Sequence, residues 1–597
     1  MWSLLFPLLF SAAAYFFFRR RFDDWAALGL GVGTGFLAFS WFGLAGYWFF
    51  GLQAGFWLAS CASVMAFGLC AARFGLALPD VDRMWTEHRA FCVFLLLSVA
   101  GFSYLAMTHF VLVQPDGWYS SGNTWGDLPF HLGVVNYFVH GASFPPQYVI
   151  FDSPLGYPFL ADFSTALLMS GASVQSALMF SSVFWFLAFL VLTYCVGLKL
   201  RFSKVESVLA LVVLFLSGGF GFLGFFDAAT QDGAGSALMA QDYTIVAPTA
   251  WTNVVTSLFL PQRTLLMGAM VFSAVFLLLL HAASRRDFIL AGALAGLMPL
   301  VHWHSFLVVL GVAALYAAME RRAQWLWFFV PAVVLALPQA LWSLQQLSPG
   351  GLVHAQPNWS ANTLDAVQAA GFWLMQTGLW IPAVLFGIWA ASQEQRLRFL
   401  PFGLLFLLAS FVAFQPYAYD NLKFFFFVQW AAAFLVAALL VKLAEQKAVW
   451  FKAAAVLILV VLVFSGVLSV ARESGLHWRL YDANDLELAD WSKAHTPRDA
   501  LFLTSSAHNH PVPSLSGRRT VMGYPGWLWT HGFDYAPVEA DVKAMYAGDR
   551  SLLQRYGVHY VVLDAKVRQD YSANAGTFAS DAVVFQNAAY RVHRIAP

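Results

Sequence analysis

Residues 125–131 read WGDLPFH and lie within a polar segment, residues 114–173, that separates long apolar runs and contains neither Lys nor Arg. In membrane proteins the cytoplasmic loops carry the excess of positive charge, so a long loop without Lys and Arg is typical of the opposite side. We therefore expect residues 114–173 to form a large outer loop. Its polar residues, Asp127 among them, then face away from the cytoplasm.

The composition is that of a polytopic membrane protein. Hydrophobic residues make up 60% of the 597 residues, charged residues make up 11%, and the mean hydropathy is +0.66. A soluble domain carries about 25% charged residues, so the composition excludes an ordinary soluble enzyme. A net charge of +1 argues against an electrostatic nucleic-acid binder.

Apolar runs of about 17–25 residues predict membrane-spanning helices. We expect about fourteen spans, an even number that places both termini on one side, and the short pair 288–301 and 304–319 also fits a re-entrant hairpin. The expected spans are 2–18, 25–49, 53–72, 91–113, 174–198, 207–226, 264–283, 288–301, 304–319, 324–342, 369–391, 398–414, 424–441 and 453–470.

The distribution of positive charge predicts the orientation of these spans. All but two of the Lys and Arg residues before residue 471 fall in turns that the span assignment places in the cytoplasm; the exceptions are Arg263 and Lys423. Such asymmetry indicates that the N-terminus, the 114–173 loop and the C-terminus are extracytoplasmic.

The character of the sequence changes near residue 474. Residues 1–473 read as one transmembrane domain, and residues 474–597 as a small extracytoplasmic α/β domain. The pattern predicts helices at 484–496, 539–546 and 551–556, and strands at 501–504, 559–563, 582–585 and 590–595.

Asp127 and His131 are the first candidates for chemistry. They are four residues apart, so a helix that begins near Asp127 places both on one face. The alternative is that Asp127 only caps this helix, with Pro129 tolerated in the first turn.

Two basic residues stand on the outer face, which otherwise lacks positive charge. Arg263 follows Pro261-Gln262, and Lys423 follows Asp420 and Asn421. Arg suits bidentate phosphate binding and Lys acts as a point charge, so both suit a lipid phosphate or pyrophosphate. The alternative is that the two side chains are interfacial anchors.

His302 and His304 lie at the outer end of a predicted span, where ionisable residues are costly and usually functional. Metal binding and plain interfacial hydrogen bonding are both compatible with this pair. No HExxH, CxxC, Walker A, dinucleotide-binding or nucleophile-elbow pattern is present. A divalent cation is therefore compatible with the sequence but not required by it.

The outer loop resembles that of the GT-C membrane glycosyltransferases, in an uncharacterised bacterial branch. The resemblance rests on residues 126–131 (GDLPFH), residues 141–146 and Gly156-Tyr157-Pro158, and on the outer C-terminal domain. The loop lacks the Asp-Asp or Asp-Glu pair of many members, which puts metal dependence in doubt.

The resemblance implies inverting transfer of a sugar from a polyprenyl-phosphate donor to a lipid, glycan or protein acceptor outside a bacterial inner membrane. It makes Asp127 the general base, with His131 as its catalytic partner. Arg263 and Lys423 would bind the donor phosphate. The residues left to orient substrate are Asp420, Asn421, His302, His304 and Tyr157.

Two other functions remain open at this stage. A transporter or flippase of lipid-linked saccharides also needs contacts to a lipid phosphate, but transporters tend to carry charges at the membrane midplane and repeated halves. A non-catalytic envelope assembly protein leaves the Asp127 loop without a purpose. The enzyme hypothesis requires Asp127, Arg263 and Lys423 to line one outward cavity continuous with the lipid.

Overall fold

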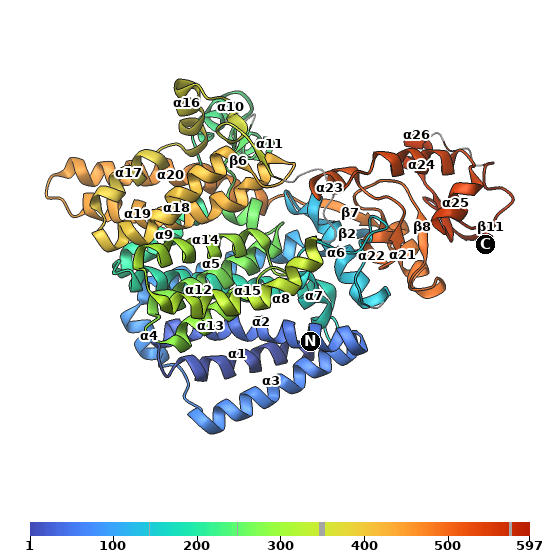
Figure 1. Ribbon diagram of the computed structural model, residues 1–597. Coiled ribbons are helices and arrows are strands. Elements are labelled where there is room, and N and C mark those ends of the chain that lie inside the picture. The colour runs from blue at the N-terminus through green and yellow to red at the C-terminus, as the bar shows by residue number, and fades with distance from the viewer. Residues whose placement is uncertain (143, 247–248, 345–352, 572, 574–575, 597) are drawn as a thin grey trace.

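The computed structural model describes residues 1–597 except 143, 247–248, 345–352, 572, 574–575 and 597. The chain is mainly helical. Most long helices run in roughly the same direction and form one body, and the C-terminal helices and strands lie at one end of it (Figure 1). Residue 143, within the 141–146 motif, lies outside the described part.

Three apolar helices at the N-terminus pack on one another. Gly31 and Gly35 allow α1 and α2 to approach closely, because a Cβ at Gly35 would lie 2.5 Å from the Ser11 Cα. Small residues four apart are typical of such membrane-helix contacts. The elements here are η1 (Trp2–Leu4), α1 (Leu5–Phe18), α2 (Asp24–Phe50), α3 (Leu52–Phe74), α4 (Val81–Glu87) and α5 (Arg89–His109).

The predicted outer loop is folded rather than irregular. A short hairpin precedes a 17-residue helix, and a second helix leads to the next long apolar helix. These elements are β1 (Leu112–Gln114), β2 (Gly117–Ser120), α6 (Thr124–His140) and α7 (Leu160–Leu168).

The central helices form the core of the body. α8 and α12 are mostly buried, and α19 packs on α9, α17, α18 and α20. The first group is α8 (Val174–Lys199), α9 (Lys204–Leu216), α10 (Phe222–Asp232), α11 (Ala234–Ala240), β3 (Ile245–Val246), β4 (Thr249–Ala250), η2 (Val254–Phe259), α12 (Arg263–His281), α13 (Arg285–Gly296), α14 (Trp303–Glu320), η3 (Ala323–Trp325) and α15 (Leu326–Leu344). The second group is β5 (His354–Ala355), η4 (Trp359–Ala361), α16 (Ala366–Thr377), α17 (Trp380–Ala390), α18 (Gln393–Phe411), β6 (Val412–Ala413), η5 (Ala418–Asn421), α19 (Leu422–Ala444) and α20 (Val449–Ser474).

The chain is a multi-pass membrane protein by helix composition, but the expected number of spans was too high. Within the described residues, nine helices are long and apolar enough to cross a membrane, or ten if the bent pair α16 and α17 counts as one span.

The difference has local causes. The expected span 207–226 ends as a helix at Leu216 because Ser217-Gly218-Gly219 interrupts it, and α13 has only 12 residues. The expected span 369–391 is bent by 87° between α16 and α17, at Gly378. At the N-terminus the apolar helix Trp2–Phe18 is shorter than a full span.

The C-terminal region contains a five-stranded mixed sheet in the order β11-β12-β10-β8-β9. All seven predicted elements of this region are present within a few residues of their predicted bounds. The elements are β7 (Trp478–Asp482), α21 (Ala483–His495), β8 (Leu501–Leu503), α22 (Pro511–Leu515), β9 (Arg519–Thr520), α23 (Pro525–Thr530), α24 (Ala536–Tyr546), α25 (Arg550–Tyr556), β10 (Tyr560–Leu563), α26 (Ala565–Tyr571), β11 (Ala582–Gln586) and β12 (Arg591–Arg594).

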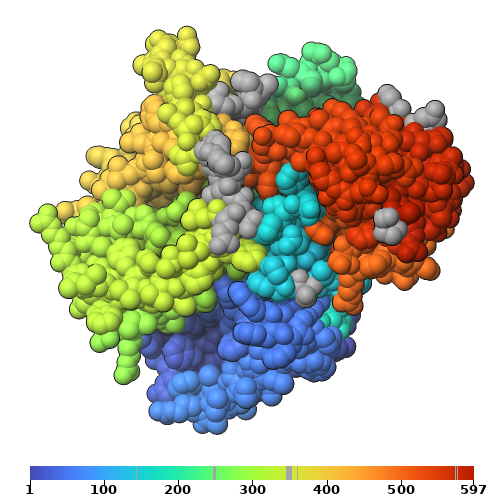
Figure 2. Space-filling view, turned by 45° about the vertical axis from the view of Figure 1, so that its right-hand side comes forward, coloured from blue at the N-terminus to red at the C-terminus, as the bar shows by residue number. Residues whose placement is uncertain are grey.

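The outer-loop elements and the C-terminal region pack directly against each other (Figure 2). Strand β7 completes a three-stranded antiparallel sheet with β1 and β2, with Trp118 opposite Tyr481. The buried Arg518 donates a 2.7 Å hydrogen bond to the carbonyl of His140 at the end of α6. The Asn136 amide donates to the carbonyl of Ser514 at 3.0 Å. These contacts fix α6, and with it Asp127, against the C-terminal region.

Candidate functional site

Asp127 lies in the first turn of α6 and does not cap it. The helix begins at Thr124, near Asp127 as expected, and its N-cap residue Asn123 makes no side-chain capping bond. The capping alternative for Asp127 was therefore wrong. The four-residue spacing keeps Asp127 and His131 on one face, as predicted.

Charged and hydrogen-bonding groups from three distant segments surround the Asp127 carboxyl. The indole N–H of Trp527 donates to it, and the Lys423 charge, like that of His131 whenever its ring is protonated, favours its ionised form. Asp420 opposes ionisation. Burial is the largest effect, and it raises the pKa of the Asp127 carboxyl above its usual range. A carboxylate with a raised pKa is a stronger base than a free one.

His131 is held by a buried ion-pair network. Its Nδ1 lies 2.8 Å from the Oδ2 of Asp162, and His131 and Asp162 are 3% and 0% exposed. The other oxygen of Asp162 accepts from Arg263 at 3.2 Å. When Nδ1 carries the proton donated to Asp162, Nε2 is the free base nitrogen.

Arg263 is buried and connects to His131 through Asp162. Its guanidinium donates to the hydroxyls of Ser182 (3.0 Å), Thr165 (2.7 Å) and Ser181 (2.8 Å), in addition to Asp162. The residue is 1% exposed, and the Trp185 ring covers it with its centroid 5.3 Å from Cζ. The donor-phosphate role expected for Arg263 stays a prediction. In this structure the guanidinium hydrogen-bonds to protein side chains instead.

Asp420 and Lys423 form an ion pair at the start of α19. The Lys423 Nζ lies 2.8 Å from the Asp420 Oδ1, and both side chains are 15% exposed. The neighbouring Asn421 is 1% exposed. Its amide donates to the carbonyls of Ala409 and Val412, at 2.8 and 2.7 Å. Asn421 therefore ties α18 to α19, and its expected substrate contact stays a prediction.

His302, His304 and Tyr157 come close to this cluster. The two histidine rings stack with centroids 5.1 Å apart, and His302 accepts from the Ser305 backbone N–H and contacts the Ser305 hydroxyl. Tyr157 hydrogen-bonds with Thr264, and its ring centroid lies 6.1 Å from that of His131. Burial raises the pKa of the Tyr157 hydroxyl, so it stays protonated at neutral pH.

Two further residues, Trp527 and His531, belong to the site although the sequence did not connect them with Asp127. Trp527 and His531 lie in and after α23, roughly 400 residues beyond Asp127 in the chain. Burial and the charge of Lys423 lower the pKa of His531 to about 3, so its ring is neutral. His531 packs against Tyr157 with centroids 5.1 Å apart. The aromatic run at residues 523–529 was the sequence signal, but nothing linked it to Asp127.

A cavity of about 340 Å³ adjoins this cluster, but Asp127, Arg263 and Lys423 are not among its described lining residues, so the structure does not show the shared cavity that the enzyme hypothesis requires. Its lining includes Tyr157, His304 and His531. The Tyr157 ring packs near that of His131. The positive charge of Lys423 acts on both His304 and His531. The lining also includes Leu307 of α14 and Leu344 of α15, which are 44% and 57% exposed. The described lining thus combines polar side chains near the Asp127 cluster with exposed apolar side chains of α14 and α15.

The described residues offer no cluster of metal-binding side chains. Among the residues that the structure describes, no three His, Cys, Asp or Glu side chains converge in a way that could hold a metal ion. His302 and His304 have Lys423 as their charged neighbour rather than a carboxylate.

The fold is similar to that of two solved archaeal structures. One is the Archaeoglobus fulgidus oligosaccharyltransferase in the apo form, with a TM-score of 0.45 and 13% identity over 82% of this chain and 71% of that chain. The other is AglB from Archaeoglobus fulgidus in complex with an inhibitory peptide and a dolichol-phosphate, with a TM-score of 0.42 and 13% identity over 81% and 70%. No protein-family model and no curated protein matches the sequence.

Proposed function

We propose that this chain is an integral membrane glycosyltransferase that moves a sugar from a polyprenyl-phosphate donor to an acceptor on the outer face of the membrane. The observation that carries the proposal is the meeting of Asp127, His131 and the Asp420–Lys423 pair, whose neighbours Tyr157, His304 and His531 line a cavity. These residues come from segments far apart in the chain. A carboxylate, a lysine and a lipid-facing cavity are the parts that such a transfer requires.

Asp127 is the general base of this reaction. The acceptor hydroxyl transfers its proton to the Asp127 carboxylate while its oxygen attacks the anomeric carbon. The bond between that carbon and the donor phosphate breaks, and polyprenyl phosphate leaves with the electron pair. A single displacement of this kind inverts the anomeric centre. A positioned base contributes on the order of 10²–10⁴-fold to such a step.

Lys423 stabilises the leaving phosphate, because charge develops there as the bond breaks. The Asp420 carboxylate orients the ammonium through the 2.8 Å ion pair. His131, fixed by Asp162, lies next to Asp127 and can share the acceptor's proton through Nε2. In this proposal Arg263 does not make the contact to the donor phosphate that the sequence predicted; it holds Asp162 and is thus a positioning residue for His131.

The donor chain enters from the membrane through the cavity that Tyr157, His304 and His531 line. Its apolar wall suits an isoprenoid, and its polar end meets the cluster at Lys423. Tyr157 and His304 orient the sugar phosphate. The same proposal divides the chain into a transmembrane domain, residues 1–473, and a C-terminal domain, residues 474–597, which closes the site through Trp527. It also places the site on the extracytoplasmic side of the membrane.

The proposal is tested in a strain that lacks the gene, with the wild-type gene restored as the control. Mass spectrometry of membrane extracts measures polyprenyl-phosphate sugars and glycoconjugates together. We expect one glycoconjugate to lose a single sugar while one polyprenyl-phosphate sugar accumulates. An unchanged glycan profile contradicts the proposal. Loss of a complete saccharide whose lipid-linked form stays on the cytoplasmic leaflet indicates a transporter instead.

A further inference from the structure

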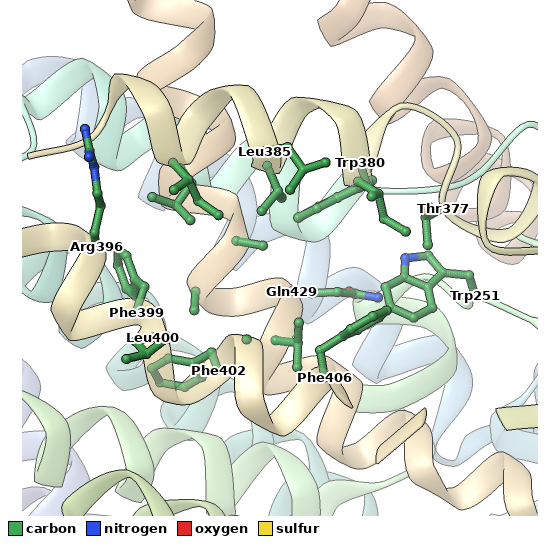
Figure 3. Close-up of a pocket in the computed structure, with 18 residues that line it drawn as sticks. Trp251, Thr377, Trp380, Leu385, Arg396, Phe399, Leu400, Phe402, Phe406 and Gln429 are labelled. Carbon is green, nitrogen blue, oxygen red and sulfur yellow. The ribbon is translucent and has the colours of Figure 1, made fainter. Parts of the chain in front are cut away.

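Charged groups are distributed unevenly through the interior of the helical body. The cavity of about 430 Å³ between α17, α18 and α19 has a mostly apolar wall, and Arg396 is the one charged residue in its described lining (Figure 3). A buried ion-pair cluster lies instead at the C-terminal end of α20. It contacts the segment that leads into α6, the helix that carries Asp127.

The centre of this cluster is Glu473, whose side chain is 0% exposed. Its Oε2 atom lies 3.1 Å from the Nε2 atom of His109 at the end of α5, which is equally buried. Its Oε1 atom accepts a hydrogen bond of 3.0 Å from the Arg472 guanidinium. Burying a carboxylate is costly unless it is paired and hydrogen-bonded. These two partners hold the Glu473 carboxylate in one position, and we call the three residues the Glu473 cluster.

Gly122 lies directly against the Glu473 carboxylate. A Cβ at this position would be only 1.7 Å from the Glu473 Oε2 atom and 2.3 Å from its Cδ atom. The backbone of Gly122 also has a φ of +47°, in the left-handed region that glycine adopts most readily. Residue 122 therefore has to be glycine for its conformation and for its contact with Glu473.

The residues on either side connect this contact to α6. The Ser120 hydroxyl donates to the carbonyl of His109, and the Ser121 hydroxyl donates to the carbonyl of Leu476. Both serines are 0% exposed. The first turn of α6 follows at once, because the Thr124 N–H donates to the Ser121 carbonyl at 3.0 Å. Residues 120–122 are thus fixed to the ends of α5 and α20 immediately before the helix begins.

We propose that Glu473 is a positioning residue for Asp127: the Glu473 cluster fixes Gly122, and thereby the first turn of α6 in which Asp127 lies. The N-cap residue Asn123 makes no side-chain capping bond, so the start of this helix depends on contacts of the kind that Glu473 provides. The consequence for catalysis rests on the function proposed above, whereas the fixing of the helix start does not.

The first test fills the contact with one methyl group. Gly122→Ala places a Cβ where the Glu473 carboxylate lies, so the start of α6 has to shift. A displacement of about 1 Å in a reacting group costs on the order of 10²-fold in rate, and we expect a loss of kcat of that size. Gly75→Ala is the matched control, because Gly75 at the end of α3 has a φ of +82° but open space at its Cβ. It carries the same backbone strain without the contact and should keep the wild-type kcat.

The pH profile separates a displaced Asp127 from a loss of folded protein. In Gly122→Ala the carboxyl of Asp127 moves away from the Trp527 N–H and from Lys423, which favour its ionised form. The fall of kcat/KM at low pH should therefore move to a higher pH by about one unit. A smaller folded fraction lowers kcat/KM equally at every pH and leaves the position of the fall unchanged.

The second test needs no substrate. Hydrogen exchange followed by mass spectrometry on the full-length protein in nanodiscs compares wild type with Glu473→Ala. We expect the amides of residues 124–131 to exchange about tenfold faster in the variant, because local opening of the helix start becomes easier. The amides of residues 134–140 should not change, since Arg518 and the Asn136 side chain hold that end of α6 to the C-terminal region.

The double variant tests whether the two residues act on each other. Glu473→Ala removes the atoms that a methyl group at residue 122 meets, so Gly122→Ala should reduce kcat less in that background than in the wild type. Unchanged exchange in Glu473→Ala overturns the proposal, and so does a Gly122→Ala variant with the kcat and pH profile of the wild type. Faster exchange in Glu473→Ala, combined with a wild-type protein that transfers no sugar, supports the fixing of α6 by Glu473 and contradicts the proposed function.

Discussion

The buried network behind His131 makes a quantitative prediction for Asp162→Asn. The substitution keeps the size of the side chain but removes the charge that Arg263 faces. Asp162 is 0% exposed and Arg263 is 1% exposed. Removing one partner of a buried ion pair typically costs about 3–5 kcal/mol, because the other charge stays buried without compensation. Arg263 keeps three hydroxyl acceptors, so we expect about 3 kcal/mol.

An exposed ion pair in the same protein provides the control. Asp152 pairs with Arg519, and the Asp152 side chain is 48% exposed. Asp152→Asn is expected to cost about 0–1 kcal/mol, because solvent screens such a pair. The double variant Asp162→Asn with Arg263→Met removes both buried charges, so it should be less destabilised than the two single costs added together.

The assay is denaturant or thermal unfolding of the purified variants in one detergent, followed by intrinsic fluorescence. The network is supported when Asp162→Asn is clearly less stable than Asp152→Asn and the double variant regains part of the loss. Equal costs for the two Asn substitutions, or strict additivity in the double variant, refute the argument that Asp162 compensates the Arg263 charge.

Three further outcomes follow from the site geometry. Lys423→Met should weaken the apparent affinity for the donor about 10–100-fold, because a charged contact to phosphate is worth about 1.5–3 kcal/mol; Lys442→Met, at the other end of α19, should change it little in the same donor titration. Asp127 must be unprotonated to act as a base, and burial raises its pKa. The value of kcat/KM should therefore fall, as the pH is lowered, at a pH above the usual Asp pKa of about 4. A fall of kcat/KM at or below about pH 4 contradicts this prediction. Trp527→Phe removes a hydrogen bond that favours the ionised Asp127 carboxylate, so the fall of kcat/KM at low pH should move to a higher pH. Trp529→Phe changes an exposed ring and should leave the pH profile unchanged.

Sequence patterns predicted a helix or strand well where the apolar spacing within that element alone indicates its type. Periodicity placed α21, β8, α24, α25, β10, β11 and β12, because each has a regular apolar spacing of its own. The number of spans was overestimated because hydropathy does not register a helix break such as Ser217-Gly218-Gly219. A helix that begins near Asp127 was expected, and α6 begins at Thr124 with Asp127 in its first turn.

The residues of the candidate site were partly accessible to sequence reasoning. Asp127, His131, Asp420 and Lys423 could be chosen because they are charged or titratable residues at the ends of apolar runs. The burial of Arg263 could not be predicted, since it depends on how Asp162, Ser181 and Ser182 of α7 and α8 pack around α12. Trp527 and His531 were missed for the same reason, because only the tertiary fold brings α23 to Asp127.

The most direct test of the account is the glycoconjugate profile of cells that carry Asp127→Asn, compared with wild type and with the deletion strain. The variant should fold, because burial makes the charged Asp127 carboxyl unfavourable and Asn carries no charge. Its amount in the membrane is measured in parallel. The account predicts that Asp127→Asn loses the same glycoconjugate as the deletion while the protein level stays normal. A wild-type profile in the variant, together with a changed profile in the deletion, contradicts the role of Asp127 as the general base.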